Sequence, residues 1–451
     1  MRDLLEDATQ RAIRYLDGLP QRSVAPTPGA IAALSTLDRP LPDSAQNPMD
    51  TLRELDTIVS PATMAMAGPR FFGFVIGGAL PVTVASNWLS TAWDQNSALH
   101  EPTPGTAVVE RVALGWLLDV LKLPPSAGGA FVTGATMANF TALAAARNAV
   151  LRRLGWQVEA DGLFGAPPIT VIISDEAHPT LLKSLGMLGL GRNRVIRVPV
   201  DGQGRMLAAR LPALSGPTII CTQAGNVNTG AFDPIGAIVD EAAAHGAWVH
   251  VDGAFGLWAA ASPRLAELCA GVEKADSWAT DAHKWLNVPY DSGVAFVRDA
   301  EAQRASMAIT AEYLPTQGGF RNPSDYTPEL SRRARGVDVW AALRTLGRSG
   351  VAEMIDRCCG HAQRFARELR AGGCDVLNEV VLNQVLVSFG DAATTRKVIA
   401  AVQAEGTLWF GPTVWQGQTA ARISVSSWAT TDEDVSRSVE AILRVWREVA
   451  G

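Results

Sequence analysis

Residues 247–254 read Ala-Trp-Val-His-Val-Asp-Gly-Ala, an apolar run that ends in an aspartate and a glycine. A lysine, Lys284, follows 32 residues after Asp252, inside the segment Ala-His-Lys-Trp-Leu-Asn at 282–287. Side chains two apart on a strand share a face, so His250 lies on the same face as Asp252. The carboxyl ends of neighbouring parallel strands line one crevice. Together the two segments predict that Asp252 and Lys284 face one ligand, whereas each residue alone would be explained by a helix cap or a solvated loop.

Around these segments, between about residues 61 and 298, helical stretches alternate with short apolar runs rich in β-branched residues. The clearest runs lie at 169–174, 194–198, 217–221, 247–252 and 293–298. Continuous apolar strands separated by helices predict an α/β fold with a mostly parallel sheet that is covered on both faces.

The pattern changes after about residue 343. A long helix is expected at 351–370, strands near 384–389 and 422–426, and a closing helix at 431–449. These elements predict a small α+β domain at 344–451, which follows a large domain at 61–343. Residues 1–60 begin with apolar residues at helical spacing and predict a helical arm that needs a surface to cover.

Composition narrows the class of protein. The chain has 451 residues, of which 47% are hydrophobic and 19% charged, and this excludes a disordered chain. A formal charge of −6 argues against binding to nucleic acid or to an anionic membrane. No apolar stretch is long enough to span a bilayer, and charged residues near the start indicate no signal peptide. Five cysteines without CxxC spacing predict buried thiols in a reducing cytoplasm, with neither disulfides nor a zinc site.

The common catalytic motifs are absent from the sequence. There is no GxGxxG after a strand, no GxxxxGK[ST] loop, no HExxH and no GxSxG. Their absence argues against the usual dinucleotide, nucleoside triphosphate, metalloprotease and hydrolase sites. The chemistry of the chain therefore depends on Asp252 and Lys284.

The segments His-Val-Asp-Gly-Ala at 250–254 and Asp-Ala-His-Lys-Trp at 281–285 resemble the signature of the group II pyridoxal-phosphate (PLP) decarboxylases. This family includes the aromatic-amino-acid and glutamate decarboxylases, and the resemblance extends from about residue 69 to about residue 443. It implies the PLP-dependent transferase fold type I, which is like that of aspartate aminotransferase. A mostly parallel seven-stranded sheet then forms the large domain, beside an α+β small C-terminal domain.

The resemblance implies roles for three residues. Lys284 would form the internal aldimine with PLP, which suits a lysine whose pKa is lowered by desolvation. Asp252 would face the pyridine nitrogen and keep it protonated, so that the ring accepts electrons from Cα. His178, after the run at 169–174, matches the histidine that stacks on the cofactor ring.

The phosphate needs backbone N–H donors at the start of a helix. The segment Phe-Val-Thr-Gly-Ala-Thr-Met-Ala-Asn at 131–139 resembles the family's phosphate-binding turn, although alone it would be read as an ordinary helix cap. The expected phosphate contacts are Ala135, Thr136, Thr280 and His283, the last with an orienting role as an equal alternative. Asp281 is expected to point away, because an anion would repel phosphate. Ala254 and Asn226 complete the expected cofactor contacts, with a plain turn as the alternative for Asn226.

The side chain of the substrate is poorly defined by the sequence. By resemblance, Phe74, Val75 and Trp93 would line its pocket and hold an aromatic or aliphatic group, while Gln95 and Asn96 would serve a polar one. Arg422 lies on a strand like the one that carries a carboxylate-binding arginine in aminotransferases, although such an arginine is more often a surface charge. It keeps an aminotransferase open as an alternative.

Related decarboxylases return a proton to Cα from a tyrosine on a mobile loop, often a loop of the partner subunit. Tyr313 and Tyr326 lie in or near a polar stretch containing Gly and Pro, typical of such a loop, and Tyr326 is the predicted donor. Without an acidic tyrosine, reaction with oxygen would give an aldehyde by decarboxylation-dependent oxidative deamination.

The sequence thus predicts a cytoplasmic PLP-dependent amino-acid decarboxylase that works as a homodimer with shared active sites. Its substrate is an amino acid, a small molecule that the sequence does not identify further, and neither nucleic acid nor membrane is an expected partner. The alternatives are an aldehyde-forming enzyme, an aminotransferase, and a protein that keeps the fold as a binding module without catalysis.

Overall fold

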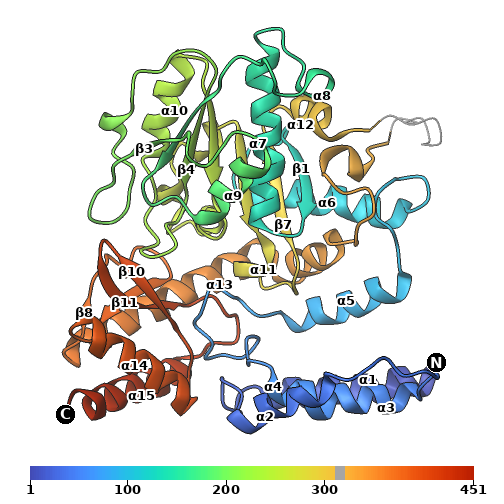
Figure 1. Cartoon of the computed structure of the whole chain (residues 1–451), viewed down its shortest axis with the longest axis vertical. Coiled ribbons are helices and arrows are strands. Elements are labelled where there is room, and N and C mark those ends of the chain that lie inside the picture. Colours follow the sequence, from blue (N-terminus) through green and yellow to red (C-terminus); the bar gives the residue numbers. More distant parts are fainter. Residues whose placement is uncertain (310–319) are drawn as a thin grey trace. The chain divides into compact units, whose positions relative to one another are not determined.

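The computed structural model describes residues 1–309 and 320–451, which form two compact units (Figure 1). One unit comprises residues 77–360 and 378–384, and the other comprises residues 1–76, 361–377 and 385–451. This division differs from the predicted domains at two places. The N-terminal residues belong to the same unit as the C-terminal part, and the boundary near residue 360 falls inside a long helix.

A seven-stranded sheet forms the centre of the unit at 77–360. Its strands are β1 (Gly128–Val132), β2 (Thr170–Ser174), β3 (Ile196–Val198), β4 (Thr218–Gln223), β5 (Trp248–Asp252), β6 (Ser277–Asp281) and β7 (Gly293–Val297). They lie in the order β1-β7-β6-β5-β4-β2-β3. Only β7 runs antiparallel to its neighbours, β1 and β6. The prediction of a mostly parallel seven-stranded sheet is therefore confirmed.

Helices surround this sheet. They are α5 (Pro81–Trp93), α6 (Pro104–Val120), α7 (Ala135–Arg152), α8 (Val158–Asp161), α9 (Pro179–Met187), α10 (Ile235–Ala244), α11 (Ala282–Trp285), α12 (Ala300–Met307) and most of α13 (Gly336–Ala371). Helix α7 packs across β1, β4, β5, β6 and β7. Its buried face is rich in alanine, which lets the helix approach the strands closely.

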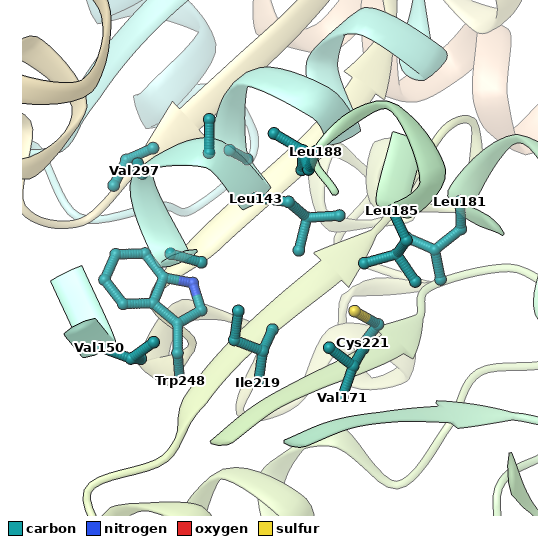
Figure 2. Packing of buried hydrophobic residues seen from close by; sticks show 14 of the residues in the cluster. Leu143, Val150, Val171, Leu181, Leu185, Leu188, Ile219, Cys221, Trp248 and Val297 are labelled. Carbon is teal, nitrogen blue, oxygen red and sulfur yellow. The ribbon is translucent and has the colours of Figure 1, made fainter. Parts of the chain in front are cut away.

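Leucines of α7 and α9 pack on one face of the sheet, as Figure 2 shows. Leu143 and Leu185 are fully buried there, over Ile219 of β4 and Trp248 of β5. Burying a leucine side chain contributes about 1.5–3 kcal/mol, so this cluster fixes α7 on the sheet. The position of α7 matters because its first turn lies at the edge of the sheet where the parallel strands end.

That edge is defined by the register of the strands. Gly293, at the start of β7, pairs with Val132 at the end of β1 and with Asp281 at the end of β6. Strand β5 lies parallel to β6 and ends at Asp252. The carboxyl ends of β1, β2, β4, β5 and β6 therefore lie at one edge, which is where ligands bind in open parallel sheets.

The other unit combines the N-terminal helices with a four-stranded sheet. Its helices are α1 (Arg2–Gly18), α2 (Pro28–Ala33), α3 (Pro48–Glu54), α4 (Ser60–Ala62), the end of α13, α14 (Ala392–Glu405) and α15 (Asp432–Ala450). Its strands, in the order β10-β11-β9-β8, are β10 (Gly411–Trp415), β11 (Gln418–Ser424), β9 (Gln384–Ser388) and β8 (Asp375–Val376). The C-terminal part is thus an α+β arrangement, with two strands and one helix beyond those expected.

A buried arginine explains why the N-terminal residues belong to this unit. Arg70 forms an ion pair of 2.8 Å with Asp434 and donates hydrogen bonds to the carbonyls of Pro20 and Thr407. The neighbouring Phe71 ring stacks on Trp409 at 5.0 Å. These contacts join the segment before residue 76 to the C-terminal part, and nothing local in the sequence indicates them.

One expectation drawn from composition agrees with the described residues. All five cysteines are free and buried, as predicted. Among residues 1–309 and 320–451, no helix combines the length and the apolar character needed to cross a membrane.

A buried ion pair on α6 holds the segment that precedes α13. Glu110 is fully buried and accepts hydrogen bonds from Arg332 at 2.8 Å and 3.1 Å. Arg332 also donates to the carbonyls of Ser97 and Phe131. On the same helix, Asp119 forms an exposed ion pair with Arg348.

These two pairs allow a matched test of stability. We expect Glu110→Ala to lower the free energy of unfolding by about 3–5 kcal/mol, because it leaves the buried Arg332 charge without its partner. Asp119→Ala should change it by about 0–1 kcal/mol. Urea unfolding followed by circular dichroism measures both, and equal losses in the two variants would contradict this account.

Candidate active site

The carboxyl edge of the sheet gathers most of the predicted site residues. Asp252 is the last residue of β5, and Lys284 lies in α11, directly after β6. His178 and Asn226 follow the ends of β2 and β4. The parallel arrangement thus places four residues from distant parts of the sequence along one edge.

Two donors hold the Asp252 carboxylate. Asp252 is 6% exposed, and its Oδ2 accepts a hydrogen bond of 3.1 Å from Nδ2 of Asn139 on α7. Its Oδ1 accepts one of 3.2 Å from the backbone N–H of Ala254. The predicted cofactor residue Ala254 therefore orients Asp252. A buried carboxylate held in this way is suited to a cationic ligand group such as a protonated ring nitrogen.

Lys284 forms an ion pair with Asp281, a residue that was expected to point away from the phosphate. Its Nζ lies 3.0 Å from Oδ2 of Asp281, and Oδ1 of Asp281 accepts a hydrogen bond of 2.6 Å from the N–H of Ala135. The expectation that Asp281 points away is wrong. The lysine cation and the positive N-terminus of α7 both attract this carboxylate, which explains its position.

The N-terminus of α7 forms the cradle expected for phosphate. Helix α7 is preceded by Gly134, and a Cβ atom on Gly293 would lie 2.4 Å from the Gly134 Cα. Only glycine therefore allows β7 and this turn to meet. Ala135 directs its N–H to the carboxylate of Asp281, and Thr136 is half-buried in the first turn. An anion can bind here, although Asp281 has to release the N–H of Ala135 to a phosphate.

His283 has a defined protonation pattern. Its Nδ1 accepts a hydrogen bond of 3.0 Å from the N–H of Ser292, so Nε2 carries the proton, and Nε2 lies 3.6 Å from Asp281. Burial lowers the pKa of His283, and this favours the neutral ring. The ring stacks on Tyr290 at 4.3 Å. These contacts agree with the orienting role and leave an N–H directed to the cradle.

Two buried polar atoms support the fit to PLP. Nδ2 of Asn226 and Oγ1 of Thr280 have no hydrogen-bond partner among the described residues. Both residues are almost fully buried, which makes an unpaired polar atom costly. Both were expected to contact the cofactor. An amine, a carboxylate, an N-terminal helix cradle and unpaired polar atoms along one edge are the groups that PLP requires.

His178 caps the N-terminus of α9. Its Nδ1 lies 2.7 Å from the hydroxyl of Thr180 and accepts a weak hydrogen bond from the Thr180 N–H. The half-buried ring is thereby fixed at the end of β2. This position is compatible with the predicted stacking on a cofactor ring.

Tyr326, the predicted proton donor, is not brought to Lys284 of its own chain. Tyr326 lies in the short helix η7 (Pro323–Tyr326), with Arg321 at 4.0 Å over its ring. Arg321 donates to the carbonyl of Gly129. Gly129 lies near the start of β1, whereas the cradle follows the carboxyl end of this strand. Tyr313 lies outside the described residues.

Trp93 is the last residue of α5. The start of this helix lies at the lysine loop, the segment around Lys284, because the Leu80 N–H donates a hydrogen bond to the Asn287 carbonyl. At 1.5 Å per residue, the helix carries Trp93 roughly 18 Å from that turn. Trp93 instead lines a surface hollow of about 440 Å³ with Gln95. Its predicted role in the substrate pocket stays a prediction.

The remaining substrate residues belong to the other unit. Val75 is buried, while Phe74 is 59% exposed, and its ring lies 5.3 Å from that of Trp409. Arg422 of β11 is half-buried, and burial lowers its pKa to about 10. Among the described residues, no carboxylate lies within ion-pair distance of it.

Sequence reasoning missed two residues that shape the site. Asn139 is a buried polar residue one turn into an alanine-rich helix, and that contrast is a signal that could have been used. Gly77 lies against the backbone of Lys284, since a Cβ atom there would be 1.9 Å from the lysine carbonyl. The sequence indicates the role of Gly77 less clearly, because the adjacent Gly78 cannot be distinguished from it by residue type.

The contact at Gly77 gives a test of the lysine loop. We expect Gly77→Ala to displace Lys284 and to lower the fraction of chains that carry cofactor at this residue after borohydride reduction, measured by peptide mass mapping. Gly115→Ala on α6 is the control, because nothing lies within 4 Å of its added methyl group. Full labelling at Lys284 in Gly77→Ala would contradict the proposed contact.

Known proteins share this arrangement. The profile of the family described as "Pyridoxal-dependent decarboxylase conserved domain" matches residues 28–390. Tryptophan decarboxylase 1 of Oryza sativa subsp. japonica is 29% identical, over 91% of this chain and 87% of its own length. L-2,4-diaminobutyrate decarboxylase of Rhizobium meliloti (strain 1021) is 30% identical, over 91% and 84%.

A solved structure of Oryza sativa TDC with PLP and tryptamine is similar to this fold, with a TM-score of 0.91 and 25% identity over 100% of this chain and 98% of that one. The predicted fold type I is therefore confirmed. The profile covers most of the chain, and Asp252 and Lys284 lie at the carboxyl ends of the adjacent strands β5 and β6. The chain belongs to the pyridoxal-dependent decarboxylase family.

Proposed function

We propose that this PLP-dependent amino-acid decarboxylase acts on an aromatic amino acid, releases the amine, and works as a cytoplasmic homodimer with shared active sites. The observation that carries the proposal is the position of Lys284, Asp252 and the N-terminus of α7 along one edge of the sheet, where Asp281 contacts both the lysine and the Ala135 N–H. The family of the chain makes it a carboxy-lyase, and different residues of this edge serve different parts of that reaction.

When bound, PLP supplies an aldehyde that links to amines and a ring that accepts the electron pair left on Cα as CO2 departs. Asp252 holds a proton on the ring nitrogen. The N–H groups of Ala135 and Thr136 bind the phosphate, with Thr280 and His283 as further donors. His178 lies at the end of β2, where it supports the face of the ring.

Asp281 contacts both Lys284 and the cradle. Its Oδ2 lies 3.0 Å from Nζ, and its Oδ1 accepts a hydrogen bond from the N–H of Ala135. The lysine amine must be neutral to attach to an aldehyde, so this ion pair has to be given up before the amine reacts. The same carboxylate must leave the Ala135 N–H when phosphate binds there.

The aromatic substrate is supported by two observations. Similar proteins include tryptophan decarboxylase 1 of rice and an aromatic-L-amino-acid decarboxylase of Bacillus atrophaeus. In the unit that carries Val75, the rings of Phe71 and Phe74 lie against Trp409, and the Phe74 ring is largely exposed. An exposed aromatic surface of this kind suits an aromatic side chain. Arg422 is available for the carboxylate of the substrate.

The proposed homodimer is supported by exposed apolar side chains. Trp88, Leu89 and Trp93 on α5 are 42%, 56% and 49% exposed. Helix α1 has apolar residues at helical spacing and none that is buried. Such surfaces commonly mark subunit contacts. In a dimer, Trp93 and Tyr326 would serve the site of the partner, which accounts for their separation from Lys284 of their own chain. The free buried cysteines support a reducing compartment.

A panel of amino acids tests the reaction and the substrate class together. We expect CO2 and amine from tryptophan, phenylalanine or tyrosine, with kcat/KM at least tenfold above those for glutamate and 2,4-diaminobutyrate, since losing a buried aromatic contact costs more than 1.4 kcal/mol. The assay measures CO2, amine, peroxide and keto acid. Peroxide with aldehyde, keto acid as the main product, or a preference for glutamate would each contradict the proposal.

Shared sites are tested by mixed dimers. We expect Trp93→Ala to raise KM and Lys284→Ala to abolish activity. A heterodimer of the two variants should regain the KM of the unmodified enzyme, because one of its sites combines an intact lysine with an intact tryptophan. Heterodimers isolated with two different affinity tags measure this, and a raised KM in the heterodimer would argue that each chain uses its own Trp93.

A further inference from the structure

A continuous chain of buried polar side chains runs under α7 and ends at Asp252. Nε1 of Trp248 donates to Oγ of Ser277 at 2.9 Å, and Oγ lies 2.9 Å from Nδ1 of His250. Nε2 of His250 lies 2.8 Å from Oδ1 of Asn139, whose Nδ2 donates to Asp252 at 3.1 Å. All five residues are buried, and those between the two ends are completely inaccessible.

The two ends of the chain fix the direction of every hydrogen bond. An ionised carboxylate only accepts, so Asn139 must present Nδ2 to Asp252 and Oδ1 to His250. Oδ1 only accepts, and Nε2 of His250 must therefore carry a proton. Burial lowers the pKa of His250 to about 3, so the ring is neutral and its Nδ1 accepts from the hydroxyl of Ser277. The indole N–H of Trp248, which only donates, completes the chain.

The reverse direction leaves a polar group unsatisfied. If Asp252 were protonated and Asn139 turned over, Nδ1–H of His250 and Nε1–H of Trp248 would both donate to Ser277. The hydroxyl proton of Ser277 would then lack an acceptor in a fully buried place, which is unfavourable. Cys221 of β4, which pairs with His250 in register, stays a neutral thiol because burial raises its pKa. The network thus favours the arrangement in which Asn139 donates to Asp252.

We propose that His250, held as the neutral Nε2–H tautomer, is a positioning residue for Asp252 and through Asn139 keeps its carboxylate oriented toward the cofactor ring nitrogen. The inference rests on the proposed role of Asp252. Asn139 and the Ala254 N–H each occupy one carboxylate oxygen, which leaves further lone pairs for the ring N–H. Strand alternation makes this possible, because residues 248, 250 and 252 share the face that α7 covers.

The first measurement is the tautomer itself. In holoenzyme labelled with ¹⁵N at its six histidines, we expect the His250 signals to show protonated Nε2 and bare Nδ1, unchanged between about pH 5 and 8. The His250→Gln variant assigns the signals. A protonated Nδ1 on His250, or titration of its ring in this range, would overturn the proposal.

The second measurement separates positioning from packing. We expect His250→Leu to raise the dissociation constant for PLP about tenfold and to shift the pH dependence of the absorbance of bound cofactor, since Asn139 is then free to turn over. His250→Gln should restore part of the affinity, because its amide can donate to Asn139. His245→Gln is the matched control. An unchanged dissociation constant in a folded His250→Leu variant overturns the positioning role.

A further variant distinguishes failure of this proposal from failure of the proposed role of Asp252. In Asp252→Leu the acceptor at the end of the chain is gone, so the His250 tautomer should no longer be fixed. This readout does not depend on catalysis. If Asp252→Leu binds PLP as tightly as the unmodified protein, the role of Asp252 fails. If the His250 spectrum is identical in both proteins, the hydrogen-bond chain fails.

Discussion

The buried carboxylate of Asp252 constrains the rest of the site. A carboxylate withdrawn from water at the end of β5 needs donors, and it takes them from Asn139 and the Ala254 backbone. Asn139 lies one turn after Ala135, so satisfying Asp252 also fixes where α7 begins. The same helix therefore positions the acid for the ring nitrogen and the N–H groups for the phosphate. A shift of α7 along the sheet would disturb both ends of the cofactor together.

Much of the large sheet could be predicted because its evidence is local. The runs that became β2, β4, β5 and β7 are continuously apolar, as expected for strands buried on both faces. Strands β1 and β6 were not identified, and their composition explains why. The first begins Gly-Gly-Ala, and the second reads Ser-Trp-Ala-Thr-Asp, with side chains that serve the buried polar chain and the edge of the sheet. Function there overrides the usual strand composition.

Some features of the structure depend on contacts between distant residues and could not be predicted from local sequence. Arg70 pairs with Asp434 across 364 positions, and no local pattern reveals that this joins the first 76 residues to the C-terminal part. Asp281 was expected to avoid the cradle on the basis of repulsion from phosphate alone. The structure adds the attraction of Lys284 and of the Ala135 N–H, which outweighs any reason for the carboxylate to turn outward.

Close backbone contacts hold the lysine loop, whereas the side chain of Asp281 beside it can rotate. Gly77 leaves no room between its Cα and the Lys284 carbonyl, and the Asn287 carbonyl accepts from the Leu80 N–H. Backbone movement around the lysine would break these contacts, whereas rotation of Asp281 about its own side-chain bonds would not. The proposed phosphate site thus requires Asp281 to rotate and does not require the lysine loop to move. In that proposal the carboxylate and the phosphate compete for the Ala135 N–H, whereas Asp252 aligns the ring.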